Sequence, residues 1–533
     1  MKIQVLRQQC PVMAIDGAYE RSPLHVATRW LEDRHQLLLL LYSLCYFACV
    51  CVHAKWRPLW YDEFFTYYLS KLTPAELSMA LAGGVDLTPP LLHLLTKLGR
   101  AVVGDNNIST RWTAIAGFWI ASLCVFSYTR RRTSALFGFI ALSGMFVTFA
   151  YKFAYEARSY GLMLGFTGLA LVCWQREGER TSIRGWWTLG TAVSLLGLVA
   201  SHLYGLFVVA VFAGAEVIRQ VRLRSFHLPM LVALLCSVIP LVLLHQQIAS
   251  ARAYSANFWA RADWAAFVGT YHLFLTSGIV AVLVAALGTT LMAQLLPGEG
   301  EGQDQNRLPL EEIALPLGLT LLPVAQIVAA RLVTGAYVAR YAISATVGIT
   351  LLFAFFTAVV TARRQAMGLV VLLCFAGWTG LQLLASLSKL RMPVDAVAVP
   401  EMLREALAEG PPVVITDGAQ YLQLHHYHPE FATRIYSLVD IDFPGAYGES
   451  DTTERTTAGL ARWTRLNTAK YADFVAGHRT FLVFYQAGGE GKSWILSKLA
   501  DDRRDLRLRK ALSGMFLYEV GPPPRGASSD LLP

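Results

Sequence analysis

The chain has 533 residues, of which 55% are hydrophobic and 16% are charged, and its mean hydropathy is positive. A soluble protein carries more charge, roughly 25% of its residues, so this composition excludes an ordinary soluble protein and favours a polytopic membrane protein. The formal net charge is +9, but the basic residues stand in short clusters between apolar runs, as topology signals do, and so do not indicate a nucleic-acid partner.

The first 35 residues are mixed polar sequence without the early apolar core of a cleavable signal peptide. We therefore expect residues 1–35 to be a cytoplasmic segment, followed by a transmembrane domain over residues 36–390. Apolar runs of suitable length predict about eleven transmembrane helices. They lie at residues 36–54, 111–129, 134–150, 159–175, 186–202, 203–219, 228–245, 268–294, 312–330, 341–361 and 368–387.

Basic residues set the expected orientation. Arginines gather at 130–132, 176–184, 219–224 and 363–364, which all fall in alternate loops. By the positive-inside rule these loops are cytoplasmic, as is the flexible linker GEGEGQDQN at 298–306. The N-terminus is then inside and the C-terminus outside, in a multi-pass protein of the cytoplasmic (inner) membrane.

The first outer loop, residues 55–110, is predicted to fold into a cap. It opens with WYDEFFTYYL, which places the adjacent carboxylates Asp62 and Glu63 directly after the first span. The following apolar face predicts a helix lying in the membrane interface. Its members are Phe64, Phe65, Tyr68, Leu69 and Leu72. A capping box from Thr73 to Glu76 predicts a second short helix.

After the last span, residues 391–520 predict a small extracytoplasmic α/β domain. PVVITD, RIYSLVD, FLVFY and MFLYEV are typical of short strands, and PEMLREALAEG is typical of a helix. The last residues, 521–533, are predicted to be a loose tail.

With this topology, unusual polar and aromatic residues gather on the outer side. They are Asp62, Glu63, Asp86, Glu156, Arg158, Tyr160, His202, Tyr204, Arg331, Arg340 and Tyr341. Each also has an ordinary explanation: an aromatic belt, acids at a helix start, a snorkelling Glu156–Arg158 pair, a helix-end histidine or an arginine on lipid headgroups. Ionisable groups at membrane depth are costly, however, so their coincidence on one side favours a functional site.

Two other motifs are set aside. AGGEGKSW, at 487–494, resembles a phosphate-binding loop, but Gln486 stands where the pattern requires glycine. HHYH, at 425–428, has residue types that bind metals but no companion ligands, and we interpret it as a surface turn.

Residues along the transmembrane region resemble those of the GT-C superfamily of membrane glycosyltransferases, near the protein mannosyltransferase and aminoarabinose transferase branch (family 39-like). The resemblance covers about residues 36–390 and rests on an ordered set of motifs. These are Asp62-Glu63, Thr88-Pro89-Pro90-Leu91, Arg111, Glu156-Ala157-Arg158-Ser159-Tyr160 and Arg340-Tyr341. Ser159 replaces a proline that is frequent in the family, and prolines common after the Arg-Tyr pair are absent.

The resemblance implies a GT-C fold and transfer of a sugar from a polyprenyl-phosphate carrier at the outer membrane face. The acceptor is a hydroxyl on a lipid, glycan or protein. Such a reaction needs a carboxylate as general base and cations to neutralise the departing phosphate. The acidic catalytic candidates are Asp62, Glu63 and Glu156, with Asp62 the expected base and Glu63 expected to brace the cap. The donor phosphate is assigned to Arg340, Tyr341, His202, Tyr204 and Arg158, and the acceptor or cap to Asp86 and Tyr160.

Two further readings stay open. A carrier or flippase for lipid-linked sugars would also place charges along a pathway, although at mid-span and near both faces. The third reading is an acceptor-binding or assembly subunit, with the C-terminal domain as its active part. The sequence implies no particular cofactor: the carboxylates are compatible with a divalent cation, but no tight ligand spacing demands one.

Overall fold

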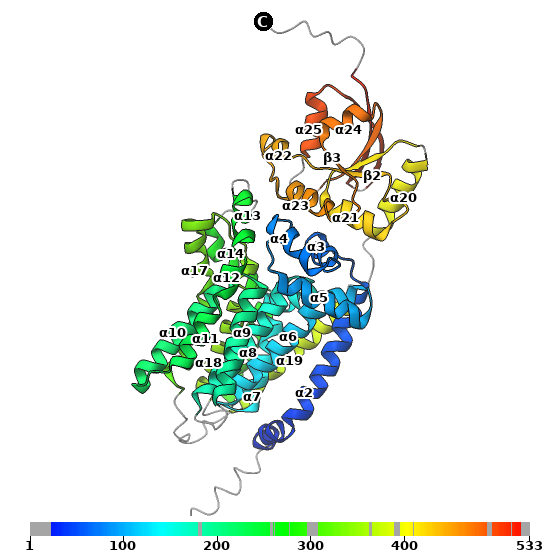
Figure 1. The fold of residues 1–533 in the computed structure, drawn as a ribbon. Helices are drawn as coiled ribbons and strands as arrows, with labels where there is room; N and C mark the ends of the chain where they lie inside the picture. The colour runs from blue at the N-terminus through cyan, green and yellow to red at the C-terminus, as the bar shows by residue number, and fades with distance from the viewer. Residues whose placement is uncertain are drawn as a thin grey trace, which may run out of the picture.

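The structure, a computed structural model, describes residues 23–179, 184–255, 260, 262–276, 278–295, 308–361, 365–388, 395–408, 410–487, 493–512 and 514–523. Most of the predicted N-terminal segment, the linker at 298–306, the centre of AGGEGKSW and nearly all of the tail lie outside these residues. The rest forms a helical bundle with a small α/β domain at one end (Figure 1).

The expected helical, polytopic architecture is confirmed. The bundle contains α2 (Pro23–Trp56), α6 (Asn107–Arg130), α7 (Ala135–Val147), η1 (Phe149–Tyr155), α8 (Ser159–Gly178), α9 (Arg184–Ser201), α10 (Gly205–Leu223), α11 (Leu228–Cys236), α12 (Ile239–Leu243), α13 (His245–Ser255), α14 (Ala265–Thr276), α15 (Ile279–Leu295), α16 (Leu310–Thr320), α17 (Leu322–Ala329), η2 (Ala330–Thr334), η3 (Ala339–Ala342), α18 (Ala345–Val360) and α19 (Gln365–Ser388). Among the described residues, three helices are long and apolar enough to cross a membrane, or up to seven spans if each bent pair counts as one.

Four spans that we expected to be continuous are bent. The helices at 134–150, 228–245, 268–294 and 312–330 belong to pairs with bends of 75°, 62°, 67° and 51° respectively. In the last pair, Pro316 lies inside α16 and Pro323 lies in the first turn of α17. Proline removes a backbone donor and clashes with the preceding turn, so hydropathy identifies the span but not its break.

Close contact between α6 and α8 depends on glycine. A Cβ atom on Gly117 would lie 2.2 Å from the carbonyl oxygen of Gly161, and one on Gly165 would lie 2.8 Å from Cα of Gly117. Small residues let helix backbones approach in a membrane, where apolar side chains gain little by leaving lipid. This contact matters for the site, because α6 begins near Arg111 and α8 begins next to Arg158.

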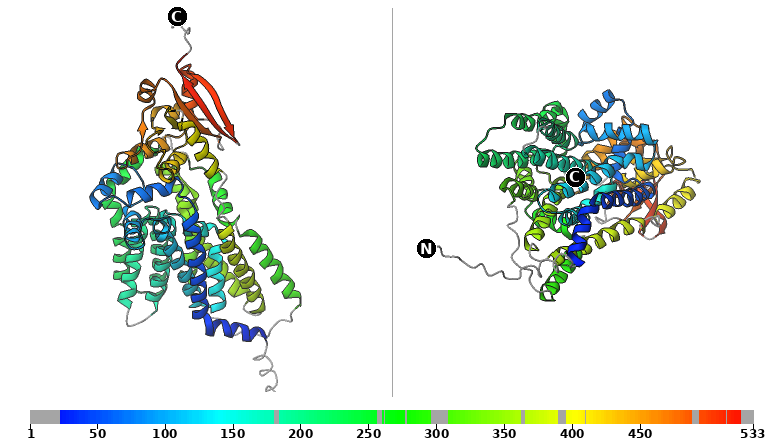
Figure 2. Two further views of the ribbon diagram at one scale, coloured as in Figure 1. Left: turned by 90° about the vertical axis from the view of Figure 1, so that its right-hand side faces the viewer. Right: turned by 90° about the horizontal axis from the view of Figure 1, so that it is seen from below.

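The loop at residues 55–110, for which we predicted a folded cap, is helical over much of its length. It contains α3 (Tyr61–Leu69), α4 (Pro74–Ala82) and α5 (Pro90–Val103). The predicted capping box of α4 is present: the backbone N–H of Glu76 donates to Oγ1 of Thr73 at 3.3 Å, and the N–H of Thr73 donates to the Glu76 carboxylate at 2.8 Å. These helices lie between the bundle and the C-terminal domain (Figures 1 and 2).

The C-terminal domain is a six-stranded sheet in the order β3-β2-β1-β4-β6-β5. The strands from β3 to β4 pair in parallel, whereas β6 is antiparallel to both β4 and β5. Its elements are α20 (Asp395–Ala408), β1 (Val413–Ile415), α21 (Gly418–Tyr427), β2 (Ile435–Leu438), α22 (Asp442–Ala446), α23 (Thr452–Ala461), β3 (Thr468–Ala469), α24 (Tyr471–Gly477), β4 (Phe481–Gln486), α25 (Trp494–Asp501), β5 (Asp505–Leu512) and β6 (Met515–Gly521).

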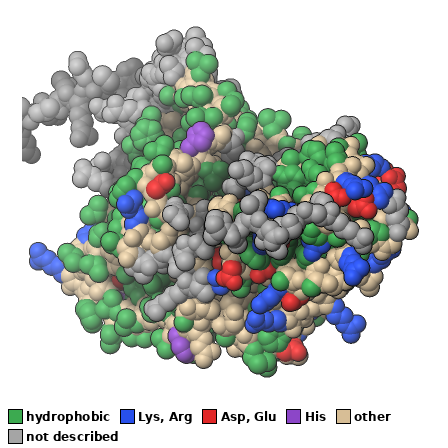
Figure 3. Space-filling model, turned by 90° about the horizontal axis from the view of Figure 1, so that it is seen from above, with side chains coloured by type: hydrophobic (Ala, Val, Ile, Leu, Met, Phe, Trp, Pro, Cys, Tyr) green, Lys and Arg blue, Asp and Glu red, His purple; other side chains and the backbone are tan. Residues whose placement is uncertain are grey.

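The four predicted strands correspond to β1, β2, β4 and β6, and the predicted helix corresponds to α20. Strand β5 was not predicted, because it is an exposed edge strand rich in arginine and lysine rather than a run of apolar residues. On the face seen from the domain end, acidic and basic side chains lie next to one another, as on a solvated surface (Figure 3).

The cap and the C-terminal domain share one hydrophobic core. Phe64, Phe65 and Leu69 of α3 are buried in the same cluster as Val413 and Ile415 of β1. The prediction that this helical face lies in the membrane interface is therefore wrong. The apolar face packs against the C-terminal domain. A helix face that contacts lipid and one that contacts protein have the same apolar periodicity, so the sequence does not distinguish them.

The interpretation of HHYH as a surface turn is also wrong. His425 and His426 lie in the last turn of α21. The ring of His426 is 4.7 Å from that of Tyr67 and 5.4 Å from that of Phe64, so it packs into the contact between the domain and the cap.

Candidate functional site

Asp62 and Arg340 form an ion pair where the cap meets the bundle. Asp62 lies in the first turn of α3, and Arg340 lies in η3, just before α18. Nη2 of Arg340 donates to Oδ2 of Asp62 at 3.1 Å, and the two side chains are 24% and 18% exposed. The guanidinium also lies over the rings of Trp60 at 5.9 Å and Tyr160 at 5.8 Å. This pair is therefore accessible to a substrate, whereas Glu63, Asp86 and Glu156 are buried.

Glu63, by contrast, is enclosed and fully paired. Arg111, which is also completely buried, donates to both carboxylate oxygens, from Nε at 2.7 Å and from Nη2 at 2.6 Å. The backbone N–H groups of Trp60 and Ala157 complete the set at 3.1 and 2.7 Å. Burial by itself raises the pKa of Glu63, but the Arg111 charge and these hydrogen bonds hold the pKa below its ordinary value. The bonds tie the start of α3 to α6 and to the turn that precedes α8.

The guanidinium of Arg111 uses its remaining donors on the same backbone turn. Nη1 donates to the carbonyl oxygens of Ala54 and Arg57, each at 2.7 Å, and Nη2 donates to that of Pro58 at 3.0 Å. The turn between α2 and α3 is therefore wrapped around one arginine. This arrangement fixes the position of the first turn of α3, which carries Asp62 directly before Glu63.

Asp86 pairs with Arg158. Nη1 of Arg158 donates to Oδ2 of Asp86 at 3.0 Å and to the Asp62 carbonyl oxygen at 3.2 Å. Burial raises the pKa of Asp86, yet the neighbouring Arg158 charge brings it below its usual range. An ion pair of Arg158 with Glu156 was the ordinary alternative, and the structure has Arg158 on Asp86 and on the start of α3. The assignment of Arg158 to the donor phosphate stays a prediction.

Glu156 is the carboxylate without a counter-ion in direct contact. Its side chain is 2% exposed, and Oε1 is buried with no hydrogen-bond partner among the described residues. Burial, followed by the negative charge of Glu63, raises the pKa of Glu156 to about 7. It is therefore a group that changes charge near neutral pH, next to the Asp62–Arg340 pair.

Tyr160, which contacts Arg340, belongs to a cluster of four aromatic side chains. The ring of His202, in the turn between α9 and α10, is 5.1 Å from that of Tyr341 and 5.8 Å from those of Tyr160 and Tyr204. Nδ1 of His202 accepts from the N–H of Tyr204 at 3.2 Å. Burial and then the nearby Arg158 and Arg340 lower the pKa of His202 to about 3, so it is neutral and offers only the donor at Nε2.

Three contributors were missed in the sequence. The amide of Gln247 donates to the carbonyl oxygens of Asp86 and Thr88 at 2.9 and 3.0 Å, and His93 lies 3.6 Å from Asp86. Arg57 lies 5.5 Å from the Tyr155 ring, and its Nη1 is buried without a partner among the described residues. Arg57 offered a signal, a cation five positions before Asp62; Gln247 comes from a helix far along the chain and offered none.

Arg331 does not join the site, and the structure gives no cluster of metal ligands among the described residues. Arg331 lies in η2, where it packs 5.3 Å from the Trp264 ring. In the part of the chain that the structure describes, no group of three or more His, Cys, Asp or Glu side chains has the geometry of a metal site. Asp62, Glu63 and Asp86 are each paired with an arginine in place of a divalent cation.

Solved structures share this fold. ArnT from Cupriavidus metallidurans in the apo state is 11% identical, with a TM-score of 0.55 over 93% of this chain and 98% of that one. The same protein bound to undecaprenyl phosphate is 12% identical, with a TM-score of 0.53 over 91% and 97% of the two chains. No known family model matches the sequence, and no curated protein matches it. The likeness confirms the expected fold, a helical membrane domain followed by a small α/β domain, since the match covers 93% of this chain.

Proposed function

We propose that this protein is a glycosyltransferase that moves a sugar, a hexose or a pentose, from a polyprenyl-phosphate carrier to a hydroxyl on a lipid, glycan or protein. The observation that carries the proposal is the Asp62–Arg340 pair: a carboxylate and a guanidinium 3.1 Å apart, partly exposed among buried polar groups. The shared fold with an ArnT bound to undecaprenyl phosphate supports this class of donor.

The proposed reaction uses both members of the pair. Asp62 takes the proton of the acceptor hydroxyl as its oxygen attacks the anomeric carbon of the sugar. The bond between that carbon and the phosphate oxygen breaks, so the products are the glycosylated acceptor and polyprenyl phosphate. Arg340 neutralises the charge that develops on the departing phosphate.

Arg340 has donors to spare for this task. One of its nitrogens binds Asp62, while its Nε is buried without a partner among the described residues. Guanidinium groups bind phosphate oxygens in a bidentate manner, and the nearby neutral His202 adds an N–H donor. Tyr341 and Tyr204 form an apolar wall beside it, which suits a substrate whose tail lies in lipid.

We further propose that the cap faces the outside of the cytoplasmic membrane. The basic ends of α6, α8 and α10, with Arg130, Arg176 and Arg222, lie at the end of the bundle away from the cap (Figures 1 and 2). The positive-inside rule then makes that end cytoplasmic. The N-terminus is inside and the α/β domain outside.

A carrier without bond chemistry is the alternative, and it would need charges near both faces. Buried and half-buried charges do occur at the far end, but they form ion pairs: Arg219 with Glu177 at 2.6 Å and Arg132 with Glu312 at 2.5 Å. Because each is paired, they are better explained as links between α6, α8, α10 and α16 than as a pathway.

The test is sugar transfer by the purified full-length protein from a labelled polyprenyl-phosphate donor. Asp62→Asn is expected to slow release of polyprenyl phosphate by at least roughly 100-fold. Asp473→Asn, at an exposed acid on α24, serves as the matched control. Donor that crosses vesicles intact, with no phosphate released by any variant, would establish the carrier instead. No reaction and no movement with a panel of donors would reject both.

A further inference from the structure

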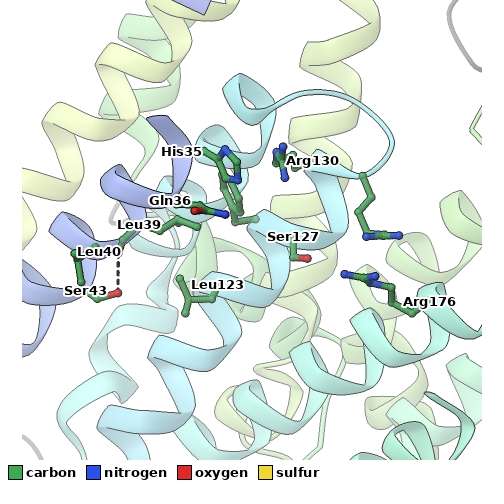
Figure 4. Close-up of a pocket in the computed structure, with 11 residues that line it drawn as sticks. His35, Gln36, Leu39, Leu40, Ser43, Leu123, Ser127, Arg130 and Arg176 are labelled. Atoms are coloured by element: carbon green, nitrogen blue, oxygen red, sulfur yellow. Dashed lines mark hydrogen bonds between the residues drawn. The ribbon is translucent and has the colours of Figure 1, made fainter. Parts of the chain in front are cut away.

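A cavity of about 400 Å³ opens between α2, α6 and α8, at the end of the bundle away from the cap (Figure 4). Its walls include His35 and Gln36 from α2, Leu123 from α6 and Arg176 from α8. It shares no residue with the Asp62–Arg340 site.

The lining changes from charged to apolar along the bundle axis. Arg130, Arg131 and Arg176 lie at the C-terminal ends of α6 and α8. Leu123 precedes Arg130 by seven residues, which is about 10 Å along a helix, and so lies deeper towards the middle of the bundle. Leu39 and Leu40 of α2 line the deeper part with it. The cavity is thus amphipathic, with its cationic end at the boundary of the bundle.

Charge within the cavity is only partly compensated. Arg130 donates to Glu32 from Nε at 2.9 Å and from Nη2 at 2.6 Å, and Arg131 pairs with Glu179. Arg176 has no acidic partner among the described residues; its guanidinium lies 5.2 Å from the Trp187 ring, and its Nε is buried without a hydrogen-bond partner. One guanidinium therefore remains for an anion from outside the protein.

The surface beside the cavity indicates which class of anion the cavity binds. Leu40, which lines it, is 56% exposed, and Leu37, Leu41 and Leu44 on the same helix are 46%, 49% and 60% exposed. These side chains belong to a helix long and apolar enough to cross a membrane, so the wall is open towards lipid rather than towards water. A soluble phosphate compound would leave the apolar half of the cavity unfilled.

We propose that this cavity binds one anionic phospholipid, with its phosphate on Arg176 and an acyl chain between α2 and α6 along Leu39, Leu40 and Leu123. Arg131 and Arg130, held by their glutamates, border the headgroup and supply further N–H donors. The site would anchor the ends of three helices through one lipid. It does not depend on the proposed sugar transfer, since it lies at the other end of the bundle.

Native mass spectrometry of the full-length protein with phosphatidylglycerol and phosphatidylcholine of identical acyl chains tests this site. We expect tighter binding of one phosphatidylglycerol, and about fivefold weaker binding of it in Arg176→Gln, the effect of one basic residue near a membrane anion. Arg224→Gln, at the exposed end of α10, is the matched control and should bind as the unmutated protein does.

A second variant keeps the test decisive if Arg176→Gln does not fold. Gln36 is exposed and lines the cavity, so Gln36→Glu adds a negative charge without disturbing the core. This charge repels the phosphate and should weaken the binding of phosphatidylglycerol to a similar extent. Equal binding of the two lipids, or a phosphatidylglycerol affinity that neither variant changes, would overturn the proposal. Displacement of the lipid by inorganic phosphate would show a site for the free anion instead.

Discussion

The carboxylate of Asp62 lies 3.1 Å from the guanidinium of Arg340, although 278 positions separate the two residues in the chain. One comes from the cap and the other from the short 3-10 turn before α18. The buried Glu63–Arg111 pair fixes the helix start that carries Asp62, and the Tyr160 ring packs against Arg340. The contact therefore joins the cap to the bundle. Its partial exposure distinguishes it from the other acid–arginine pairs of the site, and the predictions below follow from that difference.

Asp62→Asn should reduce the rate of sugar transfer by roughly 100- to 10,000-fold, the usual contribution of a positioned general base. Donor affinity should change little, because Arg340 keeps its other donors. Single-turnover transfer and donor binding, measured on the same preparation, separate the two effects. Transfer at the unmutated rate would remove Asp62 from the role and make Glu156 the next acid to test.

Arg340→Lys should weaken donor binding nearly as much as Arg340→Ala does. Lysine preserves the charge but not the planar, bidentate geometry that suits a phosphate, nor the contact with the Tyr160 ring. Equilibrium binding of a polyprenyl-phosphate sugar measures this, with Arg331→Lys as the control, since Arg331 packs on Trp264 outside the site. Donor binding that survives in a folded Arg340→Ala protein would exclude Arg340 as the phosphate ligand.

Glu63→Gln should act on stability. The substitution leaves Arg111 buried without its counter-charge, which typically costs about 3–5 kcal/mol. Asp62→Asn, at a partly exposed pair, should cost much less. Thermal unfolding of the two detergent-solubilised variants measures this difference. Equal transition temperatures for Glu63→Gln and Asp62→Asn would contradict a structural role for Glu63.

The same pair sets a direction for acid sensitivity. The pKa of Glu63 is lowered in the folded protein, so its stabilising contribution is present above the unfolded carboxyl pKa and is lost as pH falls through the folded value. The unmutated protein should therefore lose stability on acidification more steeply than Glu63→Gln. If the transition temperatures of the two proteins depend on pH in the same way, Glu63 is not the source of the acid sensitivity.

Donor affinity should fall as pH rises through about 7. Glu156 has a pKa of about 7, so it is neutral below that pH and negative above it, near the position proposed for the phosphate. A negative charge there repels the donor by an amount on the order of tenfold in affinity. Binding measured from pH 5.5 to 8.5 should show this fall, and Glu156→Gln should flatten it. The same slope in both proteins would assign the titration to another group.

Tyr61→Phe should slow transfer by about fivefold, the effect of losing one net hydrogen bond, without changing donor binding. The Tyr61 hydroxyl lies 2.5 Å from Oγ1 of Thr456 and donates to the carbonyl oxygen of Thr453 at 3.2 Å, so α23 holds the residue before Asp62. Tyr447→Phe removes a hydroxyl that binds Asp501 within the domain, and it should leave transfer unchanged. Equal rates for both variants would mean that the domain does not position Asp62.

The sequence by itself determined the helical membrane architecture, the small α/β domain and most of the residues that gather at the site. Long apolar runs identify α2, α6 and α19 because crossing lipid requires an uninterrupted hydrophobic length. The Thr73–Glu76 capping box fixed the start of α4 through contacts only three residues apart. Such signals are local, so a single sequence contains them in full.

Only the tertiary structure decided which partner each of these residues meets. Glu63 pairs with Arg111 over 48 positions, and Asp86 pairs with Arg158 over 72, where a Glu156–Arg158 pair was the local expectation. The apolar face of α3 meets the C-terminal domain and not lipid. Periodicity shows that a helix face is apolar, and a charge among apolar residues needs a compensating partner. Many partners satisfy either requirement equally well. The packing of helices that are distant in the sequence selects one of them.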